Sequence, residues 1–284
     1  MSELANSLRL LLAHPLARNA RLRTLFNIAR WQIRSRLARE IVVPWVGGTR
    51  LAVRRGMTGA TGNIYYGLHE FTDMAFLLHL LRPGDVFLDI GANIGSYTVL
   101  ASGVCKARTV AFEPGETAGR DLERNIELNG LQDLVTVRTC ALGAEDGTAS
   151  FTVGRDTMNR IATDADTEVR HVPVARLDSL PVGAPLRLIK MDVEGGEAGV
   201  VRGGQATLDS ADLIAVISES NDPYVVGELS RRGFRQAYYD PFRRTLTFDR
   251  PAHASHNHIF VRAEKDCLNR LREAPPVLAL GQRL

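Results

Sequence analysis

The sequence is poor in the residues that mark several classes of protein. It has only three cysteines, Cys105, Cys140 and Cys267, at wide spacings and without a C-x-x-C pair, which disfavours a disulfide framework, a zinc site or an iron–sulfur cluster. No uninterrupted apolar run reaches the roughly 18 residues that a membrane-spanning helix needs. The apolar stretch at residues 10–13 is too short for the core of a secretory signal. We therefore expect a reduced protein in the cytoplasm.

Charge is distributed unevenly along a chain of otherwise ordinary globular composition. Of the 284 residues, 45% are hydrophobic and 24% are charged, and the net charge is +3. Residues 1–40 hold eight arginines against Glu3 and Glu40, whereas residues 41–284 have a small negative net charge. An enzyme that acts on nucleic acid normally has a basic face on its main domain, so we expect no nucleic-acid partner. The pattern predicts an Arg-rich helical arm, residues 1–40, and a folded domain, residues 41–284.

The arm has two apolar stripes at helical spacing, separated by Pro15. Such arginine-rich amphipathic helices have two alternative locations. They can lie on an anionic membrane, here at the inner face, or they can pack on their own domain or a partner subunit, which we favour. The first stripe consists of Leu4, Leu8, Leu11 and Leu12, and the second of Leu22, Leu25, Phe26, Ala29, Ile33 and Leu37.

After the arm, apolar strand patterns alternate with helical patterns. Two short strands at 41–46 and 50–54 and a helix at 70–81 come first, and an antiparallel section closes the chain at 234–239, 245–248 and 258–261. Alternation of this kind predicts an α/β fold with a mainly parallel, doubly wound sheet. The core strands are expected at 86–90, 109–112, 135–140, 186–191 and 213–218, the helices at 97–102, 117–128 and 197–208, and additional strands at 148–153 and 172–175.

A glycine-rich turn follows the first core strand and predicts a nucleotide site. Gly91 and Gly95 allow backbone amides to approach a ligand at the carboxyl edge of the sheet. Glu113 closes the next strand, at the spacing of acids that bind a ribose. These features fit either a dinucleotide or S-adenosylmethionine. Asp89 before the turn, and Asn93 where the dinucleotide pattern wants glycine, favour the methyl donor.

Acidic residues end the next two core strands. Asp192 and Glu194 follow strand 186–191 and Glu219 follows strand 213–218, so the three would converge if these strands are neighbours. Such a group suits general base chemistry or a divalent cation with oxygen ligands at Asp192 and Glu219. Glu197 fits either this group or the first turn of the following helix equally well. In the closing section, His258 is a further catalytic candidate, although the spacing of His253, His256 and His258 only superficially resembles a metal site.

The ordered set of motifs resembles the FkbM family of methyltransferases over about residues 62–220. That resemblance implies a class I methyltransferase (Rossmann-like) fold with a seven-stranded sheet and an O-methyltransferase acting on a hydroxyl of a sugar, glycolipid or secondary metabolite. The motifs are GLHE at 67–70, LDIGANIGSYT at 88–98, AFEP at 111–114, Asn125 with LNG at 128–130, ALG at 141–143, LD at 177–178 and IKMDVEG at 189–195.

Methyl transfer to a hydroxyl needs a base, or a metal that lowers the pKa of the hydroxyl. The strand-end position of Asp192 and Glu194 predicts that they lie beside the acceptor as the catalytic carboxylates, with Glu219 and His258 as further candidates, and with Mg²⁺ as an optional cofactor. The roles at the cofactor follow from the resemblance by position. A small-molecule or glycan acceptor is implied. The residues expected to hold S-adenosylmethionine are Asp89, Gly91, Asn93 and Gly95 at the methionine and sulfonium end, Glu113 at the ribose, Cys140 with Ala141 at the adenine, and in addition Glu70 and Asp192.

Two other functions compete with methyl transfer. One is a nicotinamide-dependent oxidoreductase, because glycine turns and ribose-binding acids also occur in dinucleotide folds. The other is a binding protein that keeps the cofactor fold without catalysis.

Overall fold

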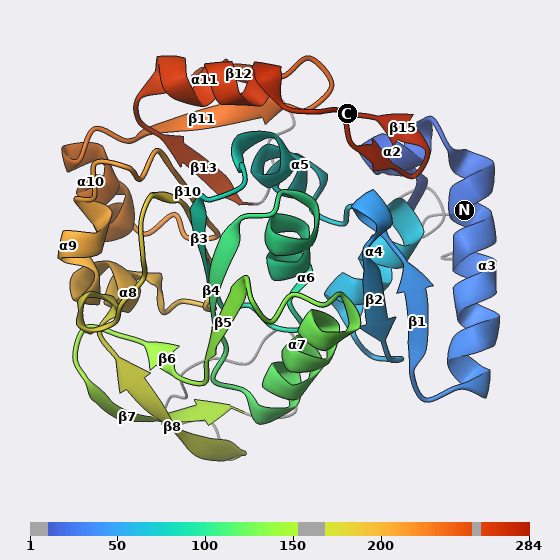
Figure 1. The fold of residues 1–284 in the computed structure, drawn as a ribbon, viewed down its shortest axis with the longest axis horizontal. Helices are drawn as coiled ribbons and strands as arrows, with labels where there is room; N and C mark the ends of the chain where they lie inside the picture. The colour runs from blue at the N-terminus through green and yellow to red at the C-terminus, as the bar shows by residue number, and fades with distance from the viewer. Residues whose placement is uncertain (1–10, 153–167, 252–256) are drawn as a thin grey trace.

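One twisted sheet organises the protein, whose computed structural model describes residues 11–152, 168–251 and 257–284 (Figure 1). The strand order is β12-β11-β13-β10-β9-β3-β4-β5. The five strands from β10 to β5 are parallel to one another, and β13, β11 and β12 add antiparallel pairs. The strands are β3 (Val86–Ile90), β4 (Arg108–Phe112), β5 (Val135–Arg138), β9 (Leu186–Met191), β10 (Ala215–Ser218), β11 (Arg235–Asp240), β12 (Thr245–Thr247) and β13 (His258–Val261).

Helices cover both faces of this sheet. Alternate strand residues divide between two clusters, because successive side chains of a strand point to opposite faces. Phe87 and Leu188 pack against α5 and α11, whereas Leu88 and Ile189 pack against α8 and α10. The helices are α4 (Thr58–Tyr66), α5 (Phe71–Leu80), α6 (Ser96–Thr98) continued by a π-helical turn (Val99–Val104), α7 (Glu116–Leu128), α8 (Glu197–Gly203), α9 (Gln205–Leu208), α10 (Pro223–Arg231) and α11 (Glu264–Glu273).

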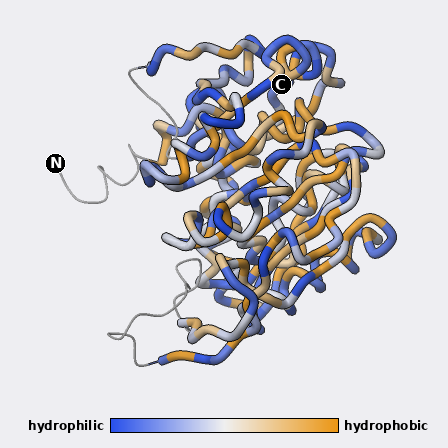
Figure 2. The backbone as a smooth tube through the Cα atoms, turned by 90° about the vertical axis from the view of Figure 1, so that its left-hand side faces the viewer, coloured by the Kyte–Doolittle hydropathy of each residue, from blue (hydrophilic) through white to orange (hydrophobic). Residues whose placement is uncertain are grey.

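Three small sheets flank the central one. The segment between β5 and β9 forms a three-stranded sheet of β6 (Ala141–Leu142), β8 (Val169–Ala175) and β7 (Gly147–Thr152). The two others are the hairpin-like pairs β1 (Ile41–Pro44) with β2 (Arg50–Val53), and β14 (Leu278–Ala279) with β15 (Gln282–Arg283). In Figure 2 the hydrophobic parts of the chain run through the middle of the molecule, where the central sheet lies.

Most expected strands are present, and the differences have local causes. The central sheet has eight strands instead of the expected seven, because β12 pairs with β11 at the antiparallel edge. The expected helix 197–208 is interrupted at Gly204, so that α8 and α9 are separate. Helices α4, α10 and α11 were not predicted. The chain thus forms the α/β doubly wound fold that the alternation of patterns predicts.

The N-terminal arm is part of the folded body. Its helix α2 (Pro15–Arg18) buries Leu16 and Ala17 completely, and α3 (Arg21–Leu37) packs along α4. Leu4 and Leu8 of the first expected stripe lie outside the described residues. In the part of the chain that the structure describes, no helix has the length and apolar character needed to cross a membrane.

The second apolar stripe is helical as expected, but it points away from the body. Leu22 is 85% exposed and Ile33 is 63% exposed, whereas Thr24, Trp31 and Ser35 form the buried side of α3. The helix therefore packs through a partly polar face, and its apolar stripe lies at the surface.

Asn125 joins three segments that surround the glycine turn. Its side chain is fully buried on α7. The Asn125 amide donates to the Ile94 carbonyl at 2.9 Å, and its oxygen accepts the Ala52 backbone N–H at 2.8 Å. The turn after β3, strand β2 and helix α7 thus depend on one side chain for their relative position.

Asn125→Ala is expected to lower the free energy of unfolding by about 2–4 kcal/mol, because it leaves a buried N–H and a buried carbonyl without partners. Asn129→Ala is the comparison, since the half-buried Asn129 side chain makes the same two kinds of bond to the Arg50 backbone, where water can replace them, and one further bond to the Asn125 carbonyl. We expect a loss of about 1 kcal/mol or less there. Urea unfolding measures both variants, and equal losses would contradict a special role for Asn125.

Candidate active site

Three strand ends form the floor of a cavity at the carboxyl edge of the sheet. Strands β3, β9 and β10 are neighbours, and the register aligns Ile90, Met191 and Ser218. The residues that follow them, Gly91, Asp192 and Glu219, therefore lie side by side and all line the cavity. Ligands of doubly wound folds bind at this edge, because the strands end there in loops that face a crevice.

Gly91 is required by a very close backbone approach. Its φ is 80°, and a Cβ atom at this position would lie 1.9 Å from the Asp192 carbonyl oxygen. Asn93 and Glu194 also have positive φ, of 50° and 47°, although neither is glycine. Non-glycine residues in this region of backbone space are uncommon and concentrate at functional sites. Both of these residues line the cavity.

Glu113 ties the glycine turn to the loop after β4. One carboxylate oxygen accepts the Asn93 backbone N–H and the other accepts the Gly115 backbone N–H, each at 2.8 Å. Burial raises the pKa of Glu113, and these two backbone hydrogen bonds oppose that shift. The carboxylate still lines the cavity, and each oxygen keeps a second lone pair for a ligand. Glu113 can thus hold the loops and a ribose together.

Asp89 and Gly95 lie behind the cavity wall. Asp89 is 1% exposed, and one of its carboxylate oxygens accepts a hydrogen bond from Thr98 Oγ1 at 2.6 Å. Its other oxygen has no partner among the described residues, and burial raises the pKa of this carboxyl group. Gly95 closes the turn through a bond from its N–H to the Ala92 carbonyl. The structure gives both residues a supporting place and no direct access to the cavity.

Lys190 supplies a buried positive charge beneath the acidic strand ends. Its Nζ donates to Asp192 Oδ2 at 2.7 Å and lies 4.6 Å from the centre of the Tyr97 ring. Burial opposes the charged ammonium, but the carboxylates of Asp192, Asp89 and Glu70 outweigh burial and raise the pKa of Lys190. In the same way Lys190 overcomes the effect of burial on Asp192 and holds the pKa of that carboxyl group below its usual value.

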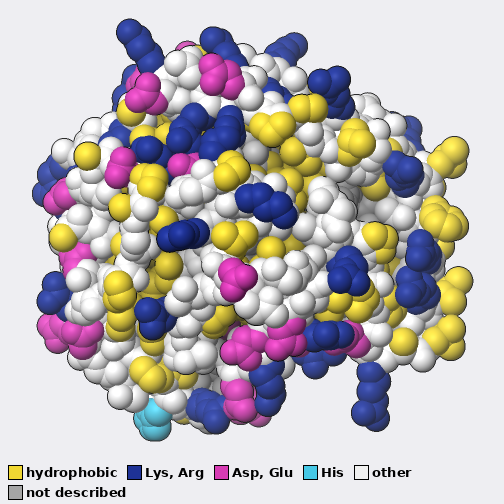
Figure 3. Space-filling view, in the orientation of Figure 1, with side chains coloured by type: hydrophobic (Ala, Val, Ile, Leu, Met, Phe, Trp, Pro, Cys, Tyr) yellow, Lys and Arg dark blue, Asp and Glu magenta, His cyan; other side chains and the backbone are white. Residues whose placement is uncertain are grey.

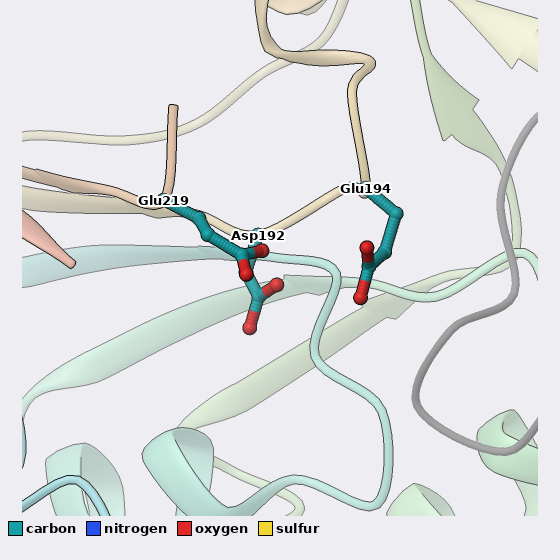
Figure 4. A group of neighbouring side chains, drawn as sticks. All are labelled: Asp192, Glu194 and Glu219. Carbon is teal, nitrogen blue, oxygen red and sulfur yellow. The ribbon is translucent and has the colours of Figure 1, made fainter. Parts of the chain in front are cut away.

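Glu219 has the opposite electrostatic character. Partial burial, a hydrogen bond with Asp192 and the nearby charges of Asp192, Glu194 and Glu197 raise the pKa of Glu219 to about 7. Figure 4 shows the Glu219 and Asp192 side chains directed toward each other from neighbouring strand ends, with Glu194 to one side. Near neutral pH the pair shares a proton, so Glu219 is able to take up or release a proton close to physiological pH.

Asp192 and Glu219 were also the candidates for a divalent cation, and the structure adds Glu194 to this group. One oxygen from each lies within 4.8 Å of the others, and carboxylates are ligands that Mg²⁺ accepts. The Lys190 ammonium already bonds to one Asp192 oxygen. The donor set fits a cation in kind, but the lysine competes with it for this oxygen.

The remaining predicted residues divide between the cavity and its surroundings. Glu70 lines the cavity and accepts a hydrogen bond from Asn257 at 3.1 Å. His258 pairs with Ser218 in the sheet, but its ring bonds to Gln236 at 2.8 Å and does not line the cavity. Glu197 accepts the Val193 N–H, in the supporting role at the start of α8 that was one of its two alternatives. His253 and His256 lie outside the described residues.

Cys140 and Ala141 line the other end of the cavity, as expected, together with residues that the sequence analysis missed. Phe151 on β7 adds an aromatic side chain there, and residues 57–60 with Asn63 form a wall from α4. Lys190 was also missed. A lysine within an otherwise apolar strand was the available signal, because a charge buried at such a position needs an opposite charge beside it. Phe151 and α4 gave no comparable signal.

The charge balance of the cavity favours a cationic ligand. Among the described residues that line it, Lys190 is the only lysine or arginine. A sulfonium with an amino group suits such surroundings, whereas the pyrophosphate of a dinucleotide would meet like charges. The acidic lining residues are Glu70, Glu113, Asp192, Glu194 and Glu219.

Comparison with known proteins gives relatives of one chemical class. The hexuronic acid methyltransferase AglP of Haloferax volcanii is 29% identical over 159 residues, which cover 54% of this chain and 64% of the relative. Methyltransferase 1 of Beauveria bassiana is 29% identical over 150 residues, covering 43% and 59%. A ribosomal protein L11 methyltransferase of Syntrophomonas wolfei is 30% identical over 97 residues, covering 34% and 30%. This chain thus spans less than two thirds of each of these relatives.

The comparisons also include a solved structure and a family model, of which the family model identifies the family. The FkbM methyltransferase of Methylobacillus flagellatus matches with a TM-score of 0.44 and 17% identity, over 72% of this chain and 55% of that chain. The profile described as the Methyltransferase FkbM domain matches residues 89–250, more than half of the chain. The match includes the glycine turn and the acidic residues Asp192, Glu194 and Glu219 that follow β9 and β10. The sequence resemblance is therefore confirmed, and the chain belongs to the FkbM family of S-adenosylmethionine-dependent methyltransferases.

Proposed function

We propose that the protein transfers a methyl group from S-adenosylmethionine to a hydroxyl group, with Glu219 as the general base. The observation that carries this proposal is the position of Glu219 in the cavity, at the strand end beside an Asp192 whose carboxylate bonds to the buried Lys190. The raised pKa of Glu219, about 7, agrees with this role. The acceptor oxygen attacks the methyl carbon while the carbon–sulfur bond breaks toward sulfur. The hydroxyl proton passes to Glu219, and S-adenosylhomocysteine leaves.

From the sequence alone, Asp192 with Glu194 is the expected catalytic pair. In the proposed mechanism Asp192 instead acts on Glu219, because a carboxylate held ionised by a buried lysine is a weak base. Its negative charge raises the proton affinity of Glu219. Glu194 remains at the rim as an acceptor of hydrogen bonds from the substrate.

The cofactor is proposed to lie along the cavity from the acidic strand ends to β6. The backbone at Gly91 and Asn93, together with Glu70, would receive the methionine part, and Glu113 would accept the ribose hydroxyls. Cys140, Ala141 and Phe151 would enclose the adenine. This placement directs the methyl group toward Asp192 and Glu219, where the acceptor must bind for an in-line displacement.

The acceptor class that this site supports best is a hydroxyl of a sugar, a glycolipid or a secondary metabolite. Three carboxylates, Asp192, Glu194 and Glu219, offer several acceptors for hydroxyl hydrogen bonds around the reacting oxygen. The relative from Haloferax volcanii is named for a hexuronic acid, which is a sugar acid. A panel of monosaccharides, uronic acids and polyketide hydroxyls, incubated with labelled S-adenosylmethionine, tests the proposal.

Calorimetric titration is expected to give micromolar binding of S-adenosylhomocysteine and no binding of NADH, because the acidic cavity repels a pyrophosphate. Tight NADH binding would contradict the placement of the donor.

The metal dependence of the reaction is tested by running the methylation assay with EDTA and with Mg²⁺. Because Lys190 already supplies a positive charge, we expect equal rates. A rate lost in EDTA and restored by Mg²⁺ would assign the acidic group to a cation instead.

Glu113→Ala is expected to weaken S-adenosylhomocysteine binding by about 1.5–3 kcal/mol if the carboxylate bonds to the ribose. The variant also loses two loop bonds, so its melting temperature is recorded with the affinity. Glu116→Ala is the matched control, since Glu116 is an exposed acid at the start of α7 that does not line the cavity. A folded Glu113→Ala protein with unchanged affinity would show that another group holds the ribose.

The pH dependence distinguishes the two carboxylates. Below about pH 7 Glu219 is protonated and cannot act as a base, so kcat/KM should rise with pH and level off above this pKa. Glu219→Gln should lower kcat by about 10²–10⁴-fold. Asp192→Asn removes a neighbouring negative charge, which lowers the pKa of Glu219 and moves the profile to lower pH.

Both variants are compared at matched cofactor saturation. Activity abolished at every pH in Asp192→Asn but retained in Glu219→Gln would overturn the assignment of the base and support Asp192 instead. Glu194→Gln is the comparison on the third carboxylate, for which we expect a change in KM and a smaller shift of the pH profile to lower pH than in Asp192→Asn, because the charge of Glu194 contributes less than Asp192 to the raised pKa of Glu219.

A further inference from the structure

Helix α3 presents a continuous apolar stripe to solvent. Leu22 is 85% exposed, Phe26 63%, Ile33 63% and Leu37 82%. Their spacing of four, seven and four residues places them along one side of a helix. Figure 3 shows hydrophobic side chains beside lysine or arginine at the right edge of the molecule, where α3 lies in Figure 1. Single exposed apolar residues are ordinary, but an aligned group marks an interaction surface.

The opposite side of α3 is anchored, which keeps the stripe outside. Trp31 is 5% exposed on that side. The Asn27 side chain donates to the Ile64 carbonyl at 3.2 Å, and the Gln32 side chain donates to the Tyr65 hydroxyl at 3.1 Å. Rotation of the helix to bury its stripe would break both bonds to α4 and expose the tryptophan.

The charges around the stripe have one sign. Helix α3 contains five arginines and no acidic residue. Among these, Arg21, Arg23, Arg30 and Arg34 make no ion pair or side-chain hydrogen bond with the residues that the structure describes. An apolar stripe bordered by unpaired guanidinium groups complements a bilayer with anionic headgroups, since acyl chains take the apolar side chains and phosphates take the arginines.

A second copy of the chain is a poorer occupant of this surface. An isologous contact places the same surface on both partners. Two α3 helices would therefore bring five arginines against five arginines without an acidic residue from either helix. Such like-charge contacts oppose association.

The surface continues toward the active site. Beyond the end of α3, Arg39 and Arg55 line a groove together with Met57 and Asn93. The last two residues also line the active-site cavity. The positive charge of the arm therefore extends along the surface to the edge of the cavity.

We propose that α3 binds the protein to anionic phospholipid bilayers. The helix lies in the membrane surface, with Leu22, Phe26, Ile33 and Leu37 inserted below the headgroups and its arginines at the phosphates. This inference does not depend on the identity of the methyl acceptor or of the catalytic base.

The test is co-sedimentation of the full chain with vesicles of phosphatidylcholine alone or mixed with phosphatidylglycerol. The wild type is expected to bind the mixed vesicles, and binding should weaken as salt is raised. The double variant Phe26→Glu, Ile33→Glu should lose binding by about tenfold or more, because two apolar side chains leave the bilayer. Val169→Glu is the matched control on an exposed apolar residue of β8, across the molecule from α3, and should bind as the wild type does.

Several outcomes would overturn the proposal. These are failure of the wild type to bind mixed vesicles, equal binding to phosphatidylcholine alone, and unchanged binding by the double variant. Sedimentation velocity is run in parallel. If the wild type is a dimer that does not bind vesicles and the double variant is a monomer, the stripe contacts a second copy of the chain. A lowered melting temperature of the variant, again without vesicle binding, would show that the chain covers its own stripe.

Discussion

The ion pair between Lys190 and Asp192 is the interaction on which the candidate active site depends. A buried ammonium is costly unless opposite charges surround it, and here Asp192, Asp89 and Glu70 do so. In return, the positive charge of Lys190 offsets the repulsion between the acidic side chains at the neighbouring strand ends. Glu219, which Lys190 does not contact directly, has a pKa raised to about 7. The two carboxylates differ because Lys190 stabilises the charge of Asp192, whereas partial burial and the neighbouring carboxylates oppose the charge of Glu219.

The central strands were predictable because a strand buried on both faces is a continuous run of apolar residues in the sequence. Strands β3 and β9 have the expected bounds, since each is an apolar run between polar turns. Gly91, Asp192 and Glu219 were found for a related reason, as parallel strands place their ends together. Helix α4 could not be found, because Gly59 and Gly62 weaken its pattern. Tertiary packing explains Gly62, since a Cβ there would lie 2.2 Å from the His69 ring.

Helix α3 illustrates a different limit of sequence analysis. Its periodicity predicted an amphipathic helix correctly, but the apolar stripe is not the side that packs on the body. The body instead takes Trp31 and the polar side chains of Asn27 and Gln32, which find partners on α4. Periodicity identifies two faces of a helix, but the shape and polarity of the neighbouring element decide which of them is buried. The roles of individual site residues likewise required distances, as the bonds of Glu113 and His258 show.

The two backbone hydrogen bonds of Glu113 preorganise the loops at one end of the cavity. Because its carboxylate already joins the turn at Asn93 to the loop at Gly115, both loops are ordered before a ligand arrives. The conformational entropy of the two loops is lost during folding, so it is not lost again when the cofactor binds. A receptor built in this way should discriminate between ligands by shape, since its loops have little freedom to adapt. The cavity end that we propose for the ribose is thus a rigid template, and we expect variation among acceptors to be accommodated at the opposite end.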